Sequence, residues 1–214
     1  MKFFFLAVFL ISTAIHLYAS LKEDSRMRNI SKPFILLSLL GLYIMAARDM
    51  SVLIIFALLF SWIGDLLLIH KGIKWFASGG VMFTISHAFF IAGYLVDVSF
   101  KKIPMFLIVL LPVIFAGTVV YIFSKLKSHL PKPLFYPAFL YLLVNGAMNC
   151  FAILRFASNP GPATIVTALG AVLFFVSDTI QFFVRFKKKS RFKTHFPIML
   201  TYSVGELLIV LGLL

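Results

Sequence analysis

The chain is a series of long apolar runs joined by short polar connectors. Each run approaches the ~20 residues that a helix needs to cross the hydrocarbon core of a bilayer. The runs fall at 3–19, 34–47, 51–69, 75–96, 103–123, 134–154, 162–184 and 196–214. The second is short, and we expect its helix to extend back into 31–33, with Pro33 tolerated in a first turn. The pattern predicts an all-α bundle of eight transmembrane helices in a single domain, 1–214.

Composition supports a membrane protein. Hydrophobic residues make up 62% of the 214 residues and charged residues 13%, whereas a soluble domain carries about 25% charged residues. Alternating segments of about ten residues, which are typical of a transmembrane barrel, do not recur. We therefore expect a multi-pass integral protein of a bacterial inner membrane or an equivalent cell membrane, and not a soluble, disordered or fibrous chain.

The net charge of +13 would indicate a nucleic-acid partner in a soluble protein, but its distribution indicates a membrane topology instead. The connectors after the first, third, fifth and seventh runs hold fifteen of the 20 Lys and Arg residues. Basic residues gather on the cytoplasmic side of membrane helices. We therefore expect these connectors to be cytoplasmic, both termini to be non-cytoplasmic, and no nucleic acid to be bound.

The first run, with Lys2 in front of it, has the features of a secretory signal peptide. Cleavage after this run would export the basic connector at 21–32, against the distribution of positive charge. We therefore expect the first run to be retained as a transmembrane helix.

Three acidic residues lie inside apolar runs: Asp65, Asp178 and Glu206. An ionisable side chain at that depth is costly unless it is paired or hydrated, so it marks a site or a pathway. The alternative for each is a hydrogen-bonded carboxylic acid that ties helices together. At ~1.5 Å per residue, Asp65 lies ~8 Å and Asp178 ~10 Å from the cytoplasmic end of its helix. These similar depths make the two aspartates candidates for one catalytic pair.

Other polar side chains are expected at matching depths on neighbouring helices. Tyr141 and Tyr202 match the level of the two aspartates, whereas His87, Asn145 and Glu206 lie nearer the midplane. We predict that these groups converge on one cavity in the cytoplasmic half of the bundle, where they position substrate or water. For His87, an interhelical hydrogen bond is the alternative role.

Several other chemistries lack their usual sequence signatures. No HExxH or HxxxH pair provides the spacing of zinc ligands, and neither GxSxG nor a glycine-rich phosphate loop is present. We therefore expect no metal and no cofactor. A metal held by the intramembrane carboxyl groups and His87 is the alternative.

The basic connectors are candidates for contact with lipid headgroups. The stretch RFKKKSRFK at 185–193 is the densest of them, and anionic lipid attracts such clusters. Lys32, Arg185 and Lys187 are the residues we expect near a headgroup phosphate. A simple topology anchor is the alternative for this stretch.

Six segments, in order along the chain, resemble the YhhN family, whose characterised members are lysoplasmalogenases. They are SKPF at 31–34, LLFSWIGDLLL at 58–68, FTISHAFFIAGY at 83–94, YLLVNGAM at 141–148, GAVLFFVSDTIQFF at 170–183 and TYSVGELLIVLG at 201–212. The GD of the third run and the SD of the seventh are the most specific parts. The last helix of the family usually carries Gln where this chain has Glu206.

The resemblance implies hydrolysis of the vinyl ether bond of a lysoplasmalogen, a single-chain lysophospholipid, to a fatty aldehyde and a glycerophospho-headgroup. Protonation of the vinyl β-carbon creates an oxocarbenium ion, to which water then adds. This reaction requires one protonated acid and one carboxylate, much as glycosidases divide labour between two carboxyl groups. Asp65 and Asp178 suit these roles, and either could be the acid. The residues that would orient water or the substrate oxygen are His87, Tyr141, Asn145 and Tyr202.

A proton-coupled transporter or a lipid-binding membrane protein is the alternative function. Intramembrane carboxyl groups and a histidine also form proton relays. Broken helices in matched halves of the chain would favour transport. Pro104 and Pro112, in the fifth run, have no clear counterpart in the other half.

Overall fold

The computed structural model describes residues 1–187 and 195–214, and within them the chain forms eight α-helices and no strand. The helices are α1 (Lys2–Leu21), α2 (Ser25–Ala46), α3 (Val52–Ile69), α4 (Ile73–Val96), α5 (Met105–Leu126), α6 (Phe135–Ser158), α7 (Pro162–Phe186) and α8 (Phe196–Leu211). Two short 3-10 helices, η1 (Phe100–Lys102) and η2 (Lys132–Leu134), precede α5 and α6. The prediction of an all-α protein is confirmed.

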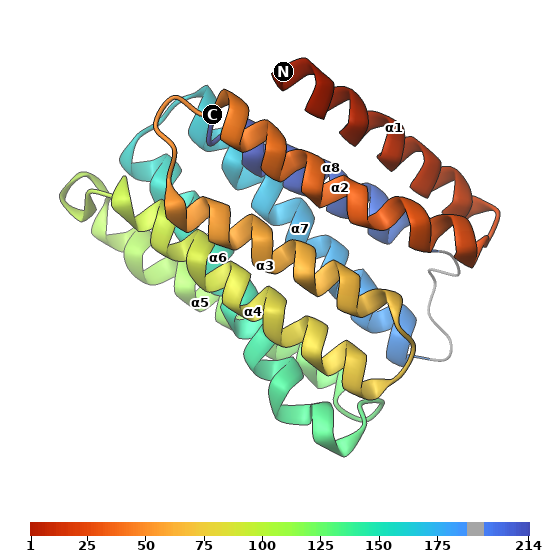
Figure 1. Cartoon of the computed structure of the whole chain (residues 1–214). Coiled ribbons are helices and arrows are strands. Elements are labelled where there is room, and N and C mark those ends of the chain that lie inside the picture. The colour runs from red at the N-terminus through yellow and green to blue at the C-terminus, as the bar shows by residue number, and fades with distance from the viewer. Residues whose placement is uncertain (188–194) are drawn as a thin grey trace.

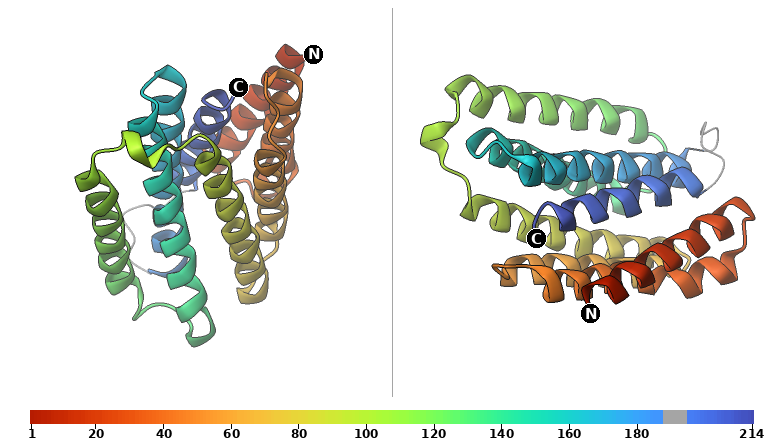
Figure 2. Two further views of the ribbon diagram at one scale, coloured as in Figure 1. Left: turned by 90° about the vertical axis from the view of Figure 1, so that its left-hand side faces the viewer. Right: turned by 90° about the horizontal axis from the view of Figure 1, so that it is seen from above.

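The helices run up and down in one bundle (Figure 1). α1 packs on α2, α3 on α4 and α7 on α8, while α4 also packs on α6. α1 and α5 lie at opposite edges of the bundle (Figure 2). Both termini lie at one end (Figure 1), which we call the terminal end. The opposite end carries the connectors after α1, α3 and α5, and we call it the basic end.

Seven helices, α1 to α7, are long and apolar enough to cross a membrane. Large apolar side chains cover the outside of the bundle, such as Met105 and Phe106 on α5, which are 80% and 64% exposed. Lipid is the solvent that such a surface requires. The chain is therefore a multi-pass integral membrane protein. α8 is also apolar, but its 16 residues make it the shortest of the eight described helices.

α2 begins earlier than the sequence predicted. It starts at Ser25, where Asp24 caps the helix by accepting a hydrogen bond of 3.0 Å from the backbone N–H of Met27. The expectation that Pro33 occupies a first turn is therefore wrong, because Pro33 lies inside the helix. The first turns are polar and fall outside the apolar run, yet a capping aspartate stabilises them as helix. The indole Nε1 of Trp62 donates to the Pro33 carbonyl at 2.9 Å and ties α3 to α2.

Glycines bring two pairs of helices close together, one of them beside Asp65. A Cβ atom at Gly64 would lie 2.7 Å from the ring of Phe83, so α3 and α4 approach closely next to Asp65. Where α7 crosses α8, a Cβ atom at Gly205 would lie 2.9 Å from the backbone oxygen of Gly170. Small residues permit this approach between membrane helices. The two crossings place α3, α4, α7 and α8 around one polar interior.

Candidate functional site

Asp178, on α7, is buried and accepts two hydrogen bonds from α6. The hydroxyl of Tyr141 and the side-chain Nδ2 of Asn145 both donate to its Oδ2 atom, the amide at 2.7 Å. Tyr141 and Asn145 are four residues apart, which places them on one face of α6. Both donors use the same oxygen, so Oδ1 of Asp178 is left for a proton or a ligand.

Asp65, on α3, lies in a different setting. The Nζ atom of Lys32, from α2, is 3.0 Å from Oδ1 of Asp65, and the two groups form an ion pair. The hydroxyl of Tyr202, from α8, donates to Oδ2 at 2.8 Å. The Lys32 and Asp65 side chains are only 15% and 3% exposed. Three helices therefore meet at a charged pair inside the bundle.

Aromatic rings link the two carboxyl sites. The ring of Phe174 lies 5.3 Å from that of Tyr202 and 5.0 Å from that of His87. The ring of His87 in turn lies 5.6 Å from that of Tyr141. No hydrogen bond in the described part of the chain joins Asp65 to Asp178, but the two are near enough to interact electrostatically. The aspartates thus belong to one region but have separate partners.

A cavity of about 610 Å³ lies beside Asp178. Its walls come mainly from α4, α6 and α7, and most of the side chains in them are apolar. The polar side chains in the walls are Thr84, Tyr136, Tyr141, Asp178 and Gln181. Asp65 is not part of the walls. Asp178 is therefore the aspartate that can touch a molecule in this cavity.

The cavity reaches the outer surface of the bundle between α4 and α6. Val81 of α4 and both Tyr136 and Leu140 of α6 belong to its walls and are exposed. Because these residues lie on membrane helices, their exposed sides face lipid. The cavity therefore reaches the part of the surface that faces lipid.

Arg185 and Lys187, two of the basic residues predicted to face a headgroup, lie at the basic end of α7, and Arg185 contacts the cavity wall. The guanidinium carbon of Arg185 is 5.0 Å from the ring centre of Phe76, which belongs to the cavity wall. The Nζ atom of Lys187 lies 5.6 Å from the ring centre of Phe183. The rest of the basic stretch, 188–193, lies outside the described residues. Arg185 and Lys187 thus place positive charge at the basic end of α7.

The residue before α8, His195, lies among the positive charges of the basic end and is held neutral there. Partial desolvation, followed by the charges of Arg28 and Lys32, lowers the pKa of His195, the residue before α8. A neutral histidine can both donate and accept a hydrogen bond. A phosphate at this end would meet several cationic side chains and this imidazole.

His87 and Glu206 lie in the interior and lack hydrogen-bond partners. Both ring nitrogens of His87 and both carboxyl oxygens of Glu206 are buried without a partner among the described residues. Within 1–187 and 195–214, no three His, Cys, Asp or Glu side chains come together as ligands for a metal ion. The metal alternative therefore has no ligand set in this part of the chain.

The sequence predicted one cavity shared by all the polar groups of the site, but of these groups the walls contain Tyr141 and Asp178 and not Asp65, His87, Asn145, Tyr202 or Glu206. Lys32 was expected at a headgroup phosphate, whereas the structure places its ammonium group against Asp65. Thr84, Tyr136 and Gln181 line the cavity and were not predicted as site residues. Gln181 lies one helical turn from Asp178, and this spacing is the signal that could have identified it.

Comparison with curated proteins and with solved structures gives no significant match. The sequence profile of the YhhN family, by contrast, matches residues 27–213. The match begins within α2, after the whole of α1, and it includes Lys32, both aspartates and Glu206. Because the matched region covers most of the chain and every residue of the candidate site, the protein belongs to the YhhN family.

Proposed function

We propose that the protein is a lysoplasmalogenase-like ether hydrolase, which cleaves the vinyl ether bond of a lysoplasmalogen inside the membrane. The observation that carries this proposal is the position of Asp178, a buried carboxyl group in the wall of an apolar cavity that reaches the lipid-facing surface. Membership of the YhhN family is consistent with a hydrolase of this type.

The cavity suits the single chain of a lysophospholipid. Its volume of about 610 Å³ lies within the ~300–1,000 Å³ that small-molecule sites occupy. The apolar walls would receive the alkenyl chain, which would arrive sideways from the bilayer. Arg185 and Lys187 would then face the phosphate, since guanidinium and ammonium groups pair with phosphate oxygens.

Asp178 is the acid in this mechanism, because it alone of the two aspartates lines the cavity. Its Oδ1 atom donates a proton to the β-carbon of the vinyl ether. The π electrons form the new C–H bond, and an oxygen lone pair stabilises the resulting oxocarbenium ion. The donors Tyr141 and Asn145 hold Oδ2, so they orient the acid and stabilise the carboxylate that it becomes.

Water completes the reaction and restores the acid. As water adds to the oxocarbenium carbon, the Asp178 carboxylate accepts the released proton. The hemiacetal then breaks its bond to the glycerol oxygen, which takes up a proton, and the products are a fatty aldehyde and the glycerophospho-headgroup. One water is consumed in each turnover, and no net proton is used.

Asp65 has a supporting role in this scheme. It does not line the cavity, and its carboxyl group is paired with Lys32. Its negative charge lies close enough to Asp178 to act on the developing cation. Through Tyr202 it also holds the aromatic rings that lie between the two carboxyl sites. We assign Asp65 as a positioning residue and Asp178 as the catalytic residue.

The orientation in the membrane follows from the charges. We propose that α8 makes an eighth crossing, because both termini lie at the terminal end of the bundle (Figure 1). Basic connectors favour the cytoplasmic side. The basic end would then face the cytoplasm, and the substrate phosphate would be bound near the cytoplasmic leaflet.

Transport or simple lipid binding is the alternative function. Transporters commonly bind their cargo where helices are interrupted near the midplane. α2 and α5 contain Pro33 and Pro112, but each helix continues through its proline. Hydrolysis therefore has the stronger support from the described helices.

Aldehyde release tests the proposal directly. Purified protein in detergent is incubated with a lysoplasmalogen, with its saturated alkyl-ether analogue and with a lysophospholipid ester of the same headgroup. We expect aldehyde from the lysoplasmalogen alone, and none from the same protein carrying Asp178→Asn. Binding of all three lipids without aldehyde formation would favour the lipid-binding alternative.

A further inference from the structure

Four of the buried polar side chains in the interior carry atoms that have no hydrogen-bond partner among residues 1–187 and 195–214. They come from three helices: His87 and Tyr94 from α4, Asn149 from α6 and Glu206 from α8. Each is 0% exposed. The unpartnered atoms are both ring nitrogens of His87, the hydroxyl of Tyr94, Oδ1 of Asn149 and both carboxyl oxygens of Glu206.

Leaving these atoms unsatisfied would be costly. Burying a polar group without a hydrogen-bond partner is unfavourable, and several such groups together would remove much of the small margin by which a typical protein is stable. Some partner must therefore satisfy them in the folded protein. That partner has to reach groups on α4, α6 and α8.

The neighbouring side chains do not supply that partner fully. Ser61 lies close to Glu206, but the hydroxyl of Ser86 donates to the Ala57 carbonyl at 2.8 Å. Ser61 must therefore donate in its 2.7 Å contact with Ser86. The hydroxyl oxygen of Ser61 can therefore only accept a hydrogen bond from Glu206 and cannot donate one to it. Water is the partner of suitable chemistry for this set, because it donates and accepts equally well.

The four residues lie on a polar route between the two ends of the interior. At one end, Asn145 donates to Asp178 at 2.7 Å, and Nδ2 of Asn149 contacts Oδ1 of Asn145 at 3.3 Å. Tyr94 is near enough to both Glu206 and Arg155 to interact electrostatically. Arg155 follows Asn145 by ten residues on α6, a distance of ~15 Å along the helix.

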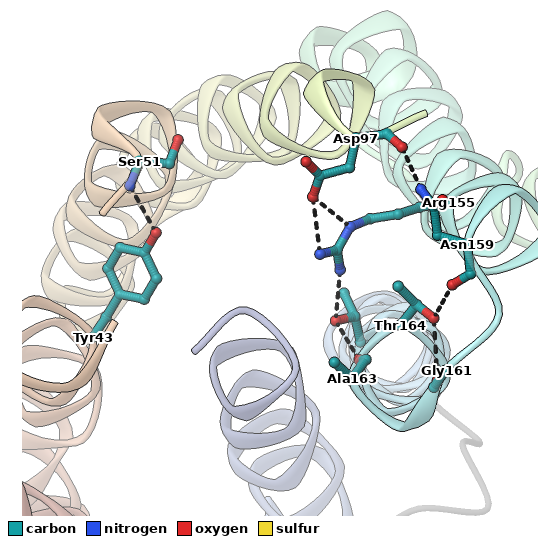
Figure 3. Close-up of polar contacts among 9 residues, drawn as sticks. Tyr43, Ser51, Asp97, Arg155, Asn159, Gly161, Ala163 and Thr164 are labelled. Carbon is teal, nitrogen blue, oxygen red and sulfur yellow. Dashed lines mark hydrogen bonds and ion pairs between the residues drawn. The ribbon is translucent and has the colours of Figure 1, made fainter. Parts of the chain in front are cut away.

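At the terminal end, the route reaches solvent through an ion pair. Nη2 of Arg155 lies 3.1 Å from Oδ2 of Asp97, and Figure 3 shows the two side chains pointing toward each other. The Asp97 side chain is 52% exposed, whereas that of Arg155 is 10% exposed. Arg155 also donates to the hydroxyl of Thr167 at 3.2 Å. Hydrogen-bonded polar side chains therefore lie at both ends of this route, beside Asp178 at one end and at the surface of the terminal end at the other.

We propose that His87, Tyr94, Asn149 and Glu206 bind a file of internal water molecules that connects the terminal end with Asp178. Its role as the supply of hydrolytic water rests on the proposed function. The apolar cavity is occupied by the lipid chain during the reaction and opens to the bilayer. Water for the oxocarbenium ion therefore reaches the carboxyl group from the side opposite the lipid.

The single cysteine of the protein provides a matched control for this proposal. Cys150 is buried among apolar side chains where α5 packs on α6. Asn149 is its neighbour on the same helix and faces the proposed water. A thiol at either position lies at nearly the same depth. The thiol of Cys150 faces an apolar cavity between α5 and α6, whereas position 149 belongs to the polar set.

The experiment compares the rates at which these two thiols react with a small cationic methanethiosulfonate in nanodiscs. One protein is unmodified, and the other carries Asn149→Cys with Cys150→Ala. We expect the thiol at position 149 to react at least about tenfold faster, because carrying a charged reagent into an apolar interface is costly. Equal slow rates would overturn the proposal. If Asn149→Cys does not fold, Ser203→Cys replaces it. Ser203 lies one helical turn from Glu206 on α8, and its buried hydroxyl also has no partner among the described residues. Its thiol must then react faster than that of Cys150.

A kinetic measurement separates the water file from the proposed function. Tyr94→Phe removes one hydroxyl of the file and leaves the ring in place. We expect kcat for lysoplasmalogen to fall by about three- to tenfold, since the loss of one hydrogen bond is worth about 1 kcal/mol, while KM stays the same. Labelling does not depend on turnover. Fast labelling without aldehyde release would therefore support the water file and contradict the proposed hydrolase activity. Aldehyde release with slow labelling and an unchanged kcat would reject the water file and retain the hydrolase.

Discussion

The Nζ atom of Lys32 lies 3.0 Å from Oδ1 of Asp65, in an ion pair formed between α2 and α3 inside the bundle. Among residues 1–187 and 195–214, the donors to Asp178 are the neutral side chains of Tyr141 and Asn145. Two carboxyl groups in one region thus have different partners. This difference allows one to hold a charge while the other exchanges a proton.

We predict that Lys32→Met destabilises the folded protein. Removing one partner of a buried ion pair leaves an uncompensated charge and costs about 3 kcal/mol or more. The measurement is thermal unfolding in detergent, with Lys187→Met as the control. Adding Asp65→Asn to Lys32→Met should restore most of the stability. If Lys32→Met and Lys187→Met unfold at the same temperature, the ion pair does not stabilise the bundle.

Asp178→Asn and Asp65→Asn should each lower the rate of aldehyde formation by about 10²-fold or more. This is the usual scale for the loss of a general acid–base group, and we expect it also for Asp65, which positions that group. The double variant should be little worse than either single one, because groups that act as a unit are not additive. Asp49→Asn, in an exposed connector, is the control. Near-normal turnover by Asp178→Asn in monodisperse protein would exclude it as the acid.

Glu206→Gln should retain most of the activity. Glu206 lies near Ser61, whose remaining hydrogen-bonding capacity is as an acceptor, so a donor is favoured at position 206. The amide of glutamine and a protonated carboxyl group both provide a donor. Turnover of the purified variant is the readout. An activity loss as large as that of Asp178→Asn would instead make Glu206 a second essential acid.

Gly205→Ala should reduce stability by about 1–3 kcal/mol, the usual cost of overpacking. The added Cβ atom would lie 2.9 Å from backbone atoms of Gly170 and Phe174, which cannot move without shifting α7. The same substitution at Gly117, where a Cβ atom meets nothing within 4 Å, is the control. Unfolding temperatures that match for the two variants would show that the α7–α8 crossing tolerates a wider spacing.

The topology is tested with single cysteines in a Cys150→Ala background. Ser128→Cys lies in the connector after α5, and Lys101→Cys lies at the opposite end in η1; both positions are exposed. An impermeant thiol reagent applied to intact cells should label position 101 and spare position 128. Labelling of position 128 alone would mean that the basic end faces outward.

The sequence alone determined the helices and the depth of the acidic residues. The length and apolarity of a run are local properties, and comparison with the thickness of a bilayer is enough to assign a spanning helix. The seven helices that are long enough to span a membrane, together with the apolar helix α8, correspond closely to the eight apolar runs of the sequence. α2 is the exception, because Asp24 extends it into polar residues that an apolar run does not include.

Only the tertiary structure decided which side chains meet. A period of 3.6 residues shows that Tyr141 and Asn145 share a face of α6, but it does not show which helix that face contacts. The rotation and lateral neighbours of each helix place Asp178 on the cavity wall and Asp65 against Lys32. These contacts join residues far apart in the sequence, such as Asp65 and Tyr202. They depend on how whole helices pack, which no local pattern of residues records.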